Sequence, residues 1–205
     1  MDKNWYAIKV FFNKVFRMED ILSDMELETY LPVKKVPLKG LEHMRAAKAL
    51  AQTGPYQRPD SRYIKEGPAI FERKPLVSSL IFVLADEQEI QEVDNRLKEE
   101  QTMGRTPGFI YKTADKEHFA AIPPIQMTSF KLVTQAAEGL DFFSGDTTRF
   151  QTGDRVRVID GPLKGAEGWI KRIKKNRRLL VCVEGVVAVA TSYIPEKFLQ
   201  IIKDE

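Results

Sequence analysis

Residues 153–178, GDRVRVIDGPLKGAEGWIKRIKKNRR, are the most informative stretch of this chain. Charged and apolar residues alternate from 155 to 159, which is the period of a strand with one buried face. Asp160-Gly161-Pro162 ends that strand, and Gly165 and Gly168 are positions where a positive φ or a close backbone approach is easy. A second strand is expected to begin directly after them.

Two β-branched runs follow the basic turn that closes this stretch. Residues 179–183 and 186–189 are rich in valine, and Gly185 lies between them. Valine favours strands because its branched side chain packs well on a pleated surface. Short strands separated by such turns predict a small barrel at the C-terminal end of the chain.

The composition is that of an ordinary globular protein. The chain has 205 residues, of which 43% are apolar and 30% charged, which allows one large or two small domains. No run approaches the length of a membrane span, and the N-terminus MDKNWYAIKV lacks the apolar core of a signal peptide. The lone Cys182 makes no intrachain disulfide, which fits a reducing compartment, so a cytoplasmic location is expected.

The charge is unevenly distributed although the net value is only +3. Residues 31–75 contain ten Lys/Arg against four Asp/Glu, and residues 153–205 contain eleven against seven. The remainder contains eleven against eighteen and is acidic. Two basic regions beside an acidic one favour contact with nucleic acid, although solvated surface charge explains either cluster equally well.

Strand and helix patterns alternate through the first 138 residues, which predicts an α/β or α+β sandwich. Asn13 is expected to cap the first helix, and Asp86 with Glu87 the second. Residues 37–72 interrupt the pattern with one short helix and a loop, and are expected to be an insertion. Residues 139–152 are polar and aperiodic and predict a linker, although Phe142-Phe143 is unusual there. The predicted strands are 5–12, 31–36, 76–85 and 108–112.

The pattern from Gly153-Asp154 through Asp160-Gly161-Pro162 to Gly168 resembles the KOW motif. Toward the other end, Trp5-Tyr6-Ala7-Ile8 is similar to the opening of the NusG N-terminal domain. Three further segments, 72–76 leading into 80–83, 108–110 and 122–125, are similar to that domain's later elements. The chain therefore resembles the NusG family of transcription elongation factors over nearly its whole length.

This resemblance implies an α+β fold in two domains. Residues 1–138 would form the N-terminal domain, with the insertion at 37–72, as a four-stranded, mainly antiparallel sheet with three helices. Residues 139–152 would be the linker, and residues 153–205 a five-stranded SH3-like KOW barrel. The longer insertion, and Val77-Ser78-Ser79-Leu80 where the family has Phe-Pro-Gly-Tyr, resemble the specialised paralogues such as RfaH and the UpxY antiterminators of polysaccharide operons.

The resemblance to the NusG family also implies a function for this chain. The N-terminal domain would bind the clamp coiled coil of the largest RNA polymerase subunit, favour elongation and oppose termination on particular long operons. The matching positions are all apolar or aromatic, and a role as core residues is the alternative for each. They are Tyr6, Val77, Leu80, Phe109 and Tyr111.

The C-terminal barrel would recruit a partner, a small-subunit ribosomal protein or the termination factor Rho. A basic cluster on its turn offers contact with nascent RNA or non-template DNA as the alternative. A protein partner is favoured because no aromatic rings interleave the basic residues for base stacking. The cluster consists of Lys171, Arg172, Lys174, Lys175, Arg177 and Arg178.

Two other functions stay open: a ribosome- or RNA-binding KOW protein that never touches polymerase, and a general cofactor of Rho-dependent termination. Enzyme chemistry is not expected. His43 and His118 are far apart and show no metal-ligand spacing, and the chain has no phosphate loop or GxSxG pattern. We therefore expect a monomeric factor without cofactor, metal or membrane attachment.

Overall fold

The computed structural model describes residues 2–51, 59–136, 138–144, 147, 153–173 and 176–202. These residues form a mixed α+β structure with four α-helices and three antiparallel sheets. The N-terminal elements are β1 Asn4–Val10, α1 Val15–Asp24, β2 Glu28–Tyr30, β3 Val33–Pro37, α2 Gly40–Ala51, β4 Tyr63–Glu66, β5 Ala69–Pro75, β6 Leu80–Ala85, α3 Glu87–Thr102, β7 Gly108–Ile110 and α4 Pro124–Ala136. The C-terminal elements are β8 Asp141–Ser144, β9 Arg155–Val158, β10 Glu167–Ile173, β11 Asn176–Val183, β12 Val187–Tyr193, the 3₁₀ helix Glu196–Phe198 and β13 Leu199–Ile201.

The first sheet has the strand order β2-β6-β1-β7 and is covered on both faces. One face, which includes Ile8 and Ile81, packs against α1 and α3. The other face, which includes Ala7 and Phe82, packs against α4 through Phe130 and its neighbours. A strand buried on both faces reads as a continuous apolar run, which is why β1 and β6 were predictable.

Of the two predicted helix caps, the one at Asp86 is confirmed and the one at Asn13 is wrong. The Asp86 side chain accepts hydrogen bonds from the N–H groups of Gln88 and Glu89, and the Glu89 carboxylate accepts one from the Asp86 N–H at 2.9 Å. This capping box confirms the predicted start of α3. The predicted cap at Asn13 is wrong, because Asn13 has φ +56° and the N-cap position is Lys14, which makes no side-chain capping bond.

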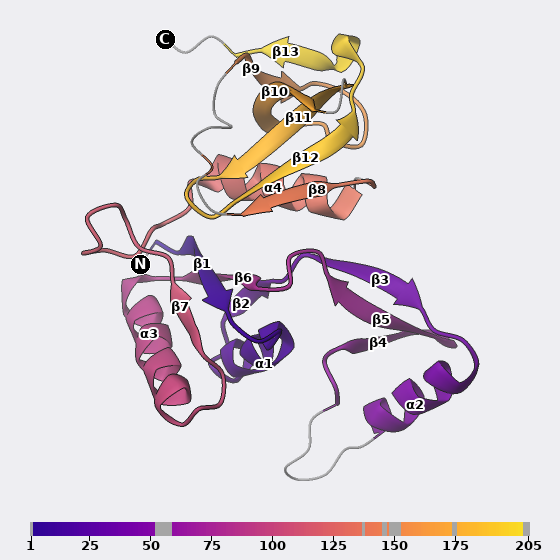
Figure 1. Ribbon diagram of the computed structural model, residues 1–205, viewed down its shortest axis with the longest axis vertical. Coiled ribbons are helices and arrows are strands. Elements are labelled where there is room, and N and C mark those ends of the chain that lie inside the picture. Colours follow the sequence, from indigo (N-terminus) through magenta and orange to yellow (C-terminus); the bar gives the residue numbers. More distant parts are fainter. Residues whose placement is uncertain are drawn as a thin grey trace.

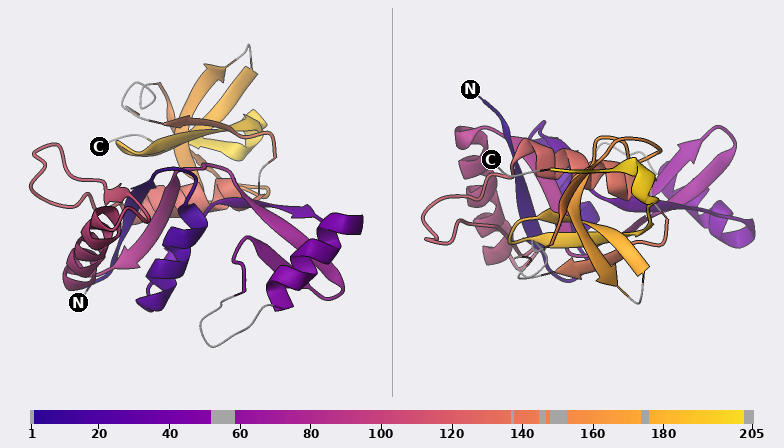
Figure 2. Two further views of the ribbon diagram at one scale, coloured as in Figure 1. Left: turned by 60° about the horizontal axis from the view of Figure 1, so that its bottom comes forward. Right: turned by 90° about the horizontal axis from the view of Figure 1, so that it is seen from above.

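Residues 31–75, which we call the basic module, form a separate unit beside the first sheet. The predicted strand 31–36 corresponds to β3, which pairs with β5 in a second sheet of order β3-β5-β4. Strand β2 lies just before it, at residues 28–30 where no strand was predicted, and pairs with β6. Strand β4 lies where a loop was predicted, and β6 starts four residues later than predicted. The sheet and α2 project to one side of the molecule (Figure 1 and Figure 2).

Arg73 of β5 fastens the basic module to α1. Its guanidinium donates to both carboxylate oxygens of Glu19 at 2.7 Å and to the carbonyl of Ser61 at 2.9 Å. It also lies over the Phe16 ring, 5.3 Å from the centroid. Since both charged side chains are largely shielded from water, this is the geometry in which an ion pair is strong.

The C-terminal sheet has the order β13-β9-β10-β11-β12-β8, so it contains six strands and not five. The extra strand, β8, lies in the predicted linker, which is therefore wrong for residues 141–144. Phe142 stands opposite Val189 and Phe143 opposite Ala188, so each ring packs on one face of the sheet. Among the described residues no pairing joins β8 to β13, and most of the remaining linker prediction, 145–146 and 148–152, falls outside them.

Helix α4 lies between the two large sheets (Figure 1). One buried cluster contains Phe82 of the first sheet, Phe130 of α4 and Val181 of the C-terminal sheet. The Ser129 hydroxyl accepts a hydrogen bond from the Glu167 N–H at 2.9 Å, and the Gln126 side chain accepts one from the Glu184 N–H at 3.0 Å. The hydrophobic core therefore continues across the predicted linker.

Replacing Arg73 with alanine should destabilise the protein by about 1–3 kcal/mol, because Glu19 loses a charged, shielded partner. Urea unfolding followed by circular dichroism measures the change. Arg62→Ala is the matched control, since the Arg62–Asp60 pair is in the same module but more exposed, and should cost at most about 1 kcal/mol. Equal losses would show that the Arg73 contacts contribute no more than a surface pair.

Gly168→Ala should strongly disrupt the C-terminal sheet. A Cβ atom at this position would lie 2.3 Å from the Leu180 carbonyl oxygen, so the paired strands β10 and β11 would have to separate. Gly185→Ala is the control: nothing lies within 4 Å of its Cβ position, and its φ of +70° should cost about 1–2 kcal/mol. Thermal unfolding that ranks the two variants the other way would contradict the close approach.

Candidate functional site

Four aromatic side chains, Phe11, Phe12, Phe109 and Tyr111, form what we call the aromatic patch. Phe11 and Phe12 follow the end of β1, and Phe109 belongs to its neighbour β7. Ring centroids are 6.5 Å apart for Phe11 and Phe12, 6.0 Å for Phe11 and Phe109, and 5.4 Å for Phe109 and Tyr111. The rings therefore form a continuous row at pairing distances.

The patch is open to solvent. Phe11 is 41% exposed, Phe12 80% and Phe109 46%. Phe12 also has φ +57°, a left-handed conformation that costs a residue with a Cβ roughly 1–2 kcal/mol. A strained backbone that presents an aromatic ring to water is typical of a binding surface rather than of a packing site.

Lys9 supplies the polar edge of this surface. It stands opposite Phe109 in the β1–β7 register, on the same face of the sheet. Its ammonium group donates a 2.8 Å hydrogen bond to the Ser79 hydroxyl, which holds the charge beside the rings. Burial raises the pKa of the Tyr111 phenol, so Tyr111 is neutral at physiological pH.

Of the five residues matched to the polymerase surface, four lie toward one face of the first sheet and Tyr6 lies on the other. Phe109 and Tyr111 are in the aromatic patch, and Val77 is half-buried against the large core. Leu80 is buried in that core, although it lies on the same face of the sheet. Tyr6 is buried on the opposite face against α3 and its neighbours, because successive residues of β1 point to alternate faces.

The sequence analysis did not identify Phe11 and Phe12 as candidate site residues. The signal was present: Phe11 is two residues after Lys9 and four after Ala7, so strand alternation places it on the same face. The sequence alone does not reveal that α4 covers Ala7 and leaves Phe11 open, since that depends on where the helix ends.

The basic cluster of the C-terminal sheet is partly neutralised. Arg178 forms an ion pair with Asp141, and Arg177 forms one with Glu196. Arg172 is exposed and stands opposite Arg177, and Lys171 is half-buried. Lys174 and Lys175 lie outside the described residues. The charge available to a nucleic acid is therefore smaller than the sequence suggests.

An apolar groove of about 580 Å³ opens beside these arginines. Arg172 and Arg177 stand at it together with Asp154 and Glu196, so both signs of charge surround an apolar floor. Such a mixture suits the side chains of another protein better than a phosphate backbone. The apolar lining comes from Val156, Ile170, Leu179, Ile194, Leu199 and Ile201.

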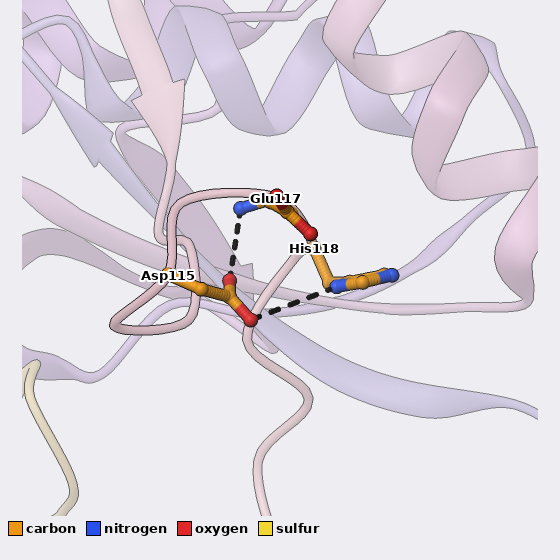
Figure 3. Close-up of side chains that lie close together, drawn as sticks. All are labelled: Asp115, Glu117 and His118. Carbon is orange, nitrogen blue, oxygen red and sulfur yellow. Dashed lines mark hydrogen bonds and ion pairs between the residues drawn. The ribbon is translucent and has the colours of Figure 1, made fainter.

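Asp115, Glu117 and His118 lie close together on the loop after β7 (Figure 3). Asp115 accepts hydrogen bonds from the Thr113 hydroxyl and the Glu117 N–H, which lower the pKa of its carboxyl group. His118 Nδ1 is 4.0 Å from the Asp115 carboxylate. All three side chains are exposed, and these contacts stabilise the turn.

A family model of the KOW motif matches residues 152–183, which include β9, β10 and all of β11. No curated protein matches the chain. The predicted KOW motif is thus confirmed, and the C-terminal part belongs to the class of KOW-containing proteins, which is consistent with association with RNA or the ribosome. None of the helices in the described ranges is both long and apolar enough to cross a bilayer.

The Cys182 thiol is buried, and desolvation raises its pKa to about 12. An unfolded thiol ionises near pH 8.5. Above that pH the unfolded chain binds fewer protons than the folded one, so the free energy of unfolding should fall as pH rises. Between pH 7.5 and 10 the Cys182 contribution should be about 2 kcal/mol.

Cys182→Ala isolates this contribution, because it removes the thiol and leaves every other titrating group in place. Urea unfolding of both proteins at pH 7.5 and 10 should show the larger loss of stability in the wild type. Parallel losses would mean that the folded thiol ionises as readily as the unfolded one.

Proposed function

We propose that this protein is a NusG-type transcription elongation factor whose aromatic patch binds the clamp coiled coil of the largest RNA polymerase subunit. The open row of Phe11, Phe12 and Phe109 carries the proposal. A coiled-coil tip is a helical surface that can bury apolar side chains against such a row. The order of the family-like segments, 5–8 before 80–83 and 108–110, supports the assignment.

The energetics are adequate for a specific complex. Covering the exposed parts of three phenylalanine rings removes roughly 300 Å² of apolar surface from water, worth about 7 kcal/mol before the cost of association. Lys9 adds a positive charge at the edge of the patch, where it is held by Ser79. A clamp held closed in this way resists pausing, which favours elongation and antitermination.

The C-terminal sheet recruits a second protein through its apolar groove. Ion pairs of Arg177 and Arg178 reduce the attraction for RNA, which favours a protein such as a ribosomal protein or Rho. The insertion at 37–72, which makes up most of the basic module, is longer than the corresponding segment of housekeeping elongation factors in the family. Together with Val77-Ser78-Ser79-Leu80, it supports a factor specialised for particular long operons, with RfaH and UpxY as the comparable paralogues.

A second candidate function rests on the KOW match alone. A ribosome- or RNA-associated protein needs no contact with polymerase, and the match at 152–183 is equally compatible with it. The open aromatic patch distinguishes the two, because it is far from the KOW motif in the chain and would have no role in that alternative.

The test is binding to core RNA polymerase and, separately, to the isolated coiled-coil fragment of its largest subunit. Phe11→Ser and Phe109→Ser should each weaken binding to both by at least about tenfold, since each removes a ring from the interface. Tyr193→Ser is the matched control, because Tyr193 is an aromatic residue on the C-terminal sheet that is at least as exposed as Phe11 and Phe109. Thermal unfolding checks that the three variants remain folded.

Unchanged binding by both phenylalanine variants would refute the patch assignment. Wild-type protein that binds ribosomal RNA but neither polymerase nor the coiled-coil fragment would establish the second candidate instead.

A further inference from the structure

The basic module has more positive charge than its own acids neutralise. Four of its cations are paired: Lys35 with Glu66, Arg62 with Asp60, Lys74 with Glu72, and Arg73 with Glu19. Five others form no ion pair with any described residue. They are Lys34, Lys39, Arg45, Lys48 and Lys65.

Strand register places two of these lysines on the face that α2 covers. Lys34 stands opposite Lys74 in β5, and Lys65 stands opposite Ile70, so all share the face of Ile70. Ile70 is buried, and α2 is the helix that contacts β5. Lys65 stands beside Ile70, at the end of β5 nearer to α2, whereas Lys34 stands opposite Lys74 and lines a hollow with Glu138 just after α4.

Helix α2 presents further cations on its outer surface. Among its residues only Ala46 is buried, and Arg45 and Lys48 are exposed at a spacing of three. Leu41 and Met44 are exposed beside them, and Lys39 precedes the helix. The surface is thus a basic array with a small apolar strip along a helix of 12 residues, about 18 Å long.

The position of the module keeps this array clear of the acidic remainder of the chain. The module projects from the body (Figure 2), and Arg73 holds its sheet to α1 from the opposite face of β5. The array therefore faces outward, and Glu42 in the first turn is the one carboxylate that α2 itself carries against its cations.

We infer that the basic module binds the phosphodiester backbone of a nucleic acid across α2, with Arg45 and Lys48 as central contacts and Lys39 and Lys65 beside them. Four cations along about 18 Å of helix face the repeated charges of about five base-pair steps. An anionic membrane fits less well, because two exposed apolar residues are far fewer than an interfacial helix buries. This binding is independent of the aromatic patch, which lies on other elements.

The experiment measures fluorescence anisotropy of a labelled 24-base-pair DNA duplex, the same DNA as a single strand, and a 24-nucleotide RNA hairpin, each at 50–200 mM salt. Arg45→Gln with Lys48→Gln should raise the Kd for the preferred nucleic acid at least about tenfold at the lowest salt. For duplex DNA the slope of log K against log salt should become shallower by about 2, since each lost phosphate contact removes about 0.9. Whichever of the three binds tightest identifies the nucleic acid.

Lys98→Gln with Lys116→Gln is the matched control, because it removes the same charge from exposed lysines outside the module. It should leave the salt slope unchanged. Lys171→Gln with Arg172→Gln tests the C-terminal sheet, and Leu41→Ser with Met44→Ser tests the apolar strip. Neither pair should change the slope by as much as the α2 pair.

The inference is overturned if the α2 and control pairs weaken binding equally, or if only the C-terminal pair does so. It is also overturned if the wild type binds phosphatidylserine vesicles but none of the three nucleic acids. The α2 pair should still bind core polymerase like the wild type, so failure of this inference and failure of the proposed function give different results.

Discussion

Burial of α4 on two sides is the constraint on which the rest of the structure depends. Phe130 and its neighbours at helical spacing pack on the first sheet, while Ser129 and Gln126 on the adjoining side accept hydrogen bonds from the C-terminal sheet. A helix that is apolar on one side and able to satisfy backbone N–H groups on the other joins two sheets without leaving unpaired polar groups between them. The Glu167 side chain is buried and ion-paired with Arg155 and Arg157 of the neighbouring strand β9, so these pairs hold within the C-terminal sheet the residue whose N–H bonds to α4.

The same helix determines where the aromatic patch begins. It covers Ala7 and Phe82, and Lys131 on it lies 3.6 Å from the centroid of the Trp5 ring. Farther along β1 the covered face gives way to Lys9 and then to Phe11. The patch is therefore the uncovered continuation of a core face, which explains why its residues look like core residues in the sequence.

Prediction from the sequence succeeded where local pattern and final environment agree. Strands β1 and β6 are buried on both faces and are continuous apolar runs, and the Asp86 capping box involves residues three apart in the chain. It failed where the deciding contact is distant. Strand β8 has no strand pattern of its own and exists because it pairs with β12, where Phe143 and its register partner Ala188 are 45 residues apart in the chain. Strand β2 likewise lies outside the predicted strand 31–36 and exists because residues 28–30 pair with β6.

Prediction of the candidate site was also limited by contacts between residues that are distant in the chain. Phe109 was found because it stands in a family-like segment, but Tyr6 was placed with it although β1 points that ring to the opposite face. The alternation of side chains along β1 can be read from the sequence, whereas the place where α4 stops covering that face cannot.

A factor that binds polymerase through the aromatic patch and a second protein through the C-terminal groove needs both surfaces open in one conformation. Phe109 is exposed and Ile201 at the groove is exposed while both sheets pack on α4. Polymerase binding at the patch would thus need no release of the C-terminal sheet, because Phe11, Phe12 and Phe109 are exposed while that sheet packs on α4.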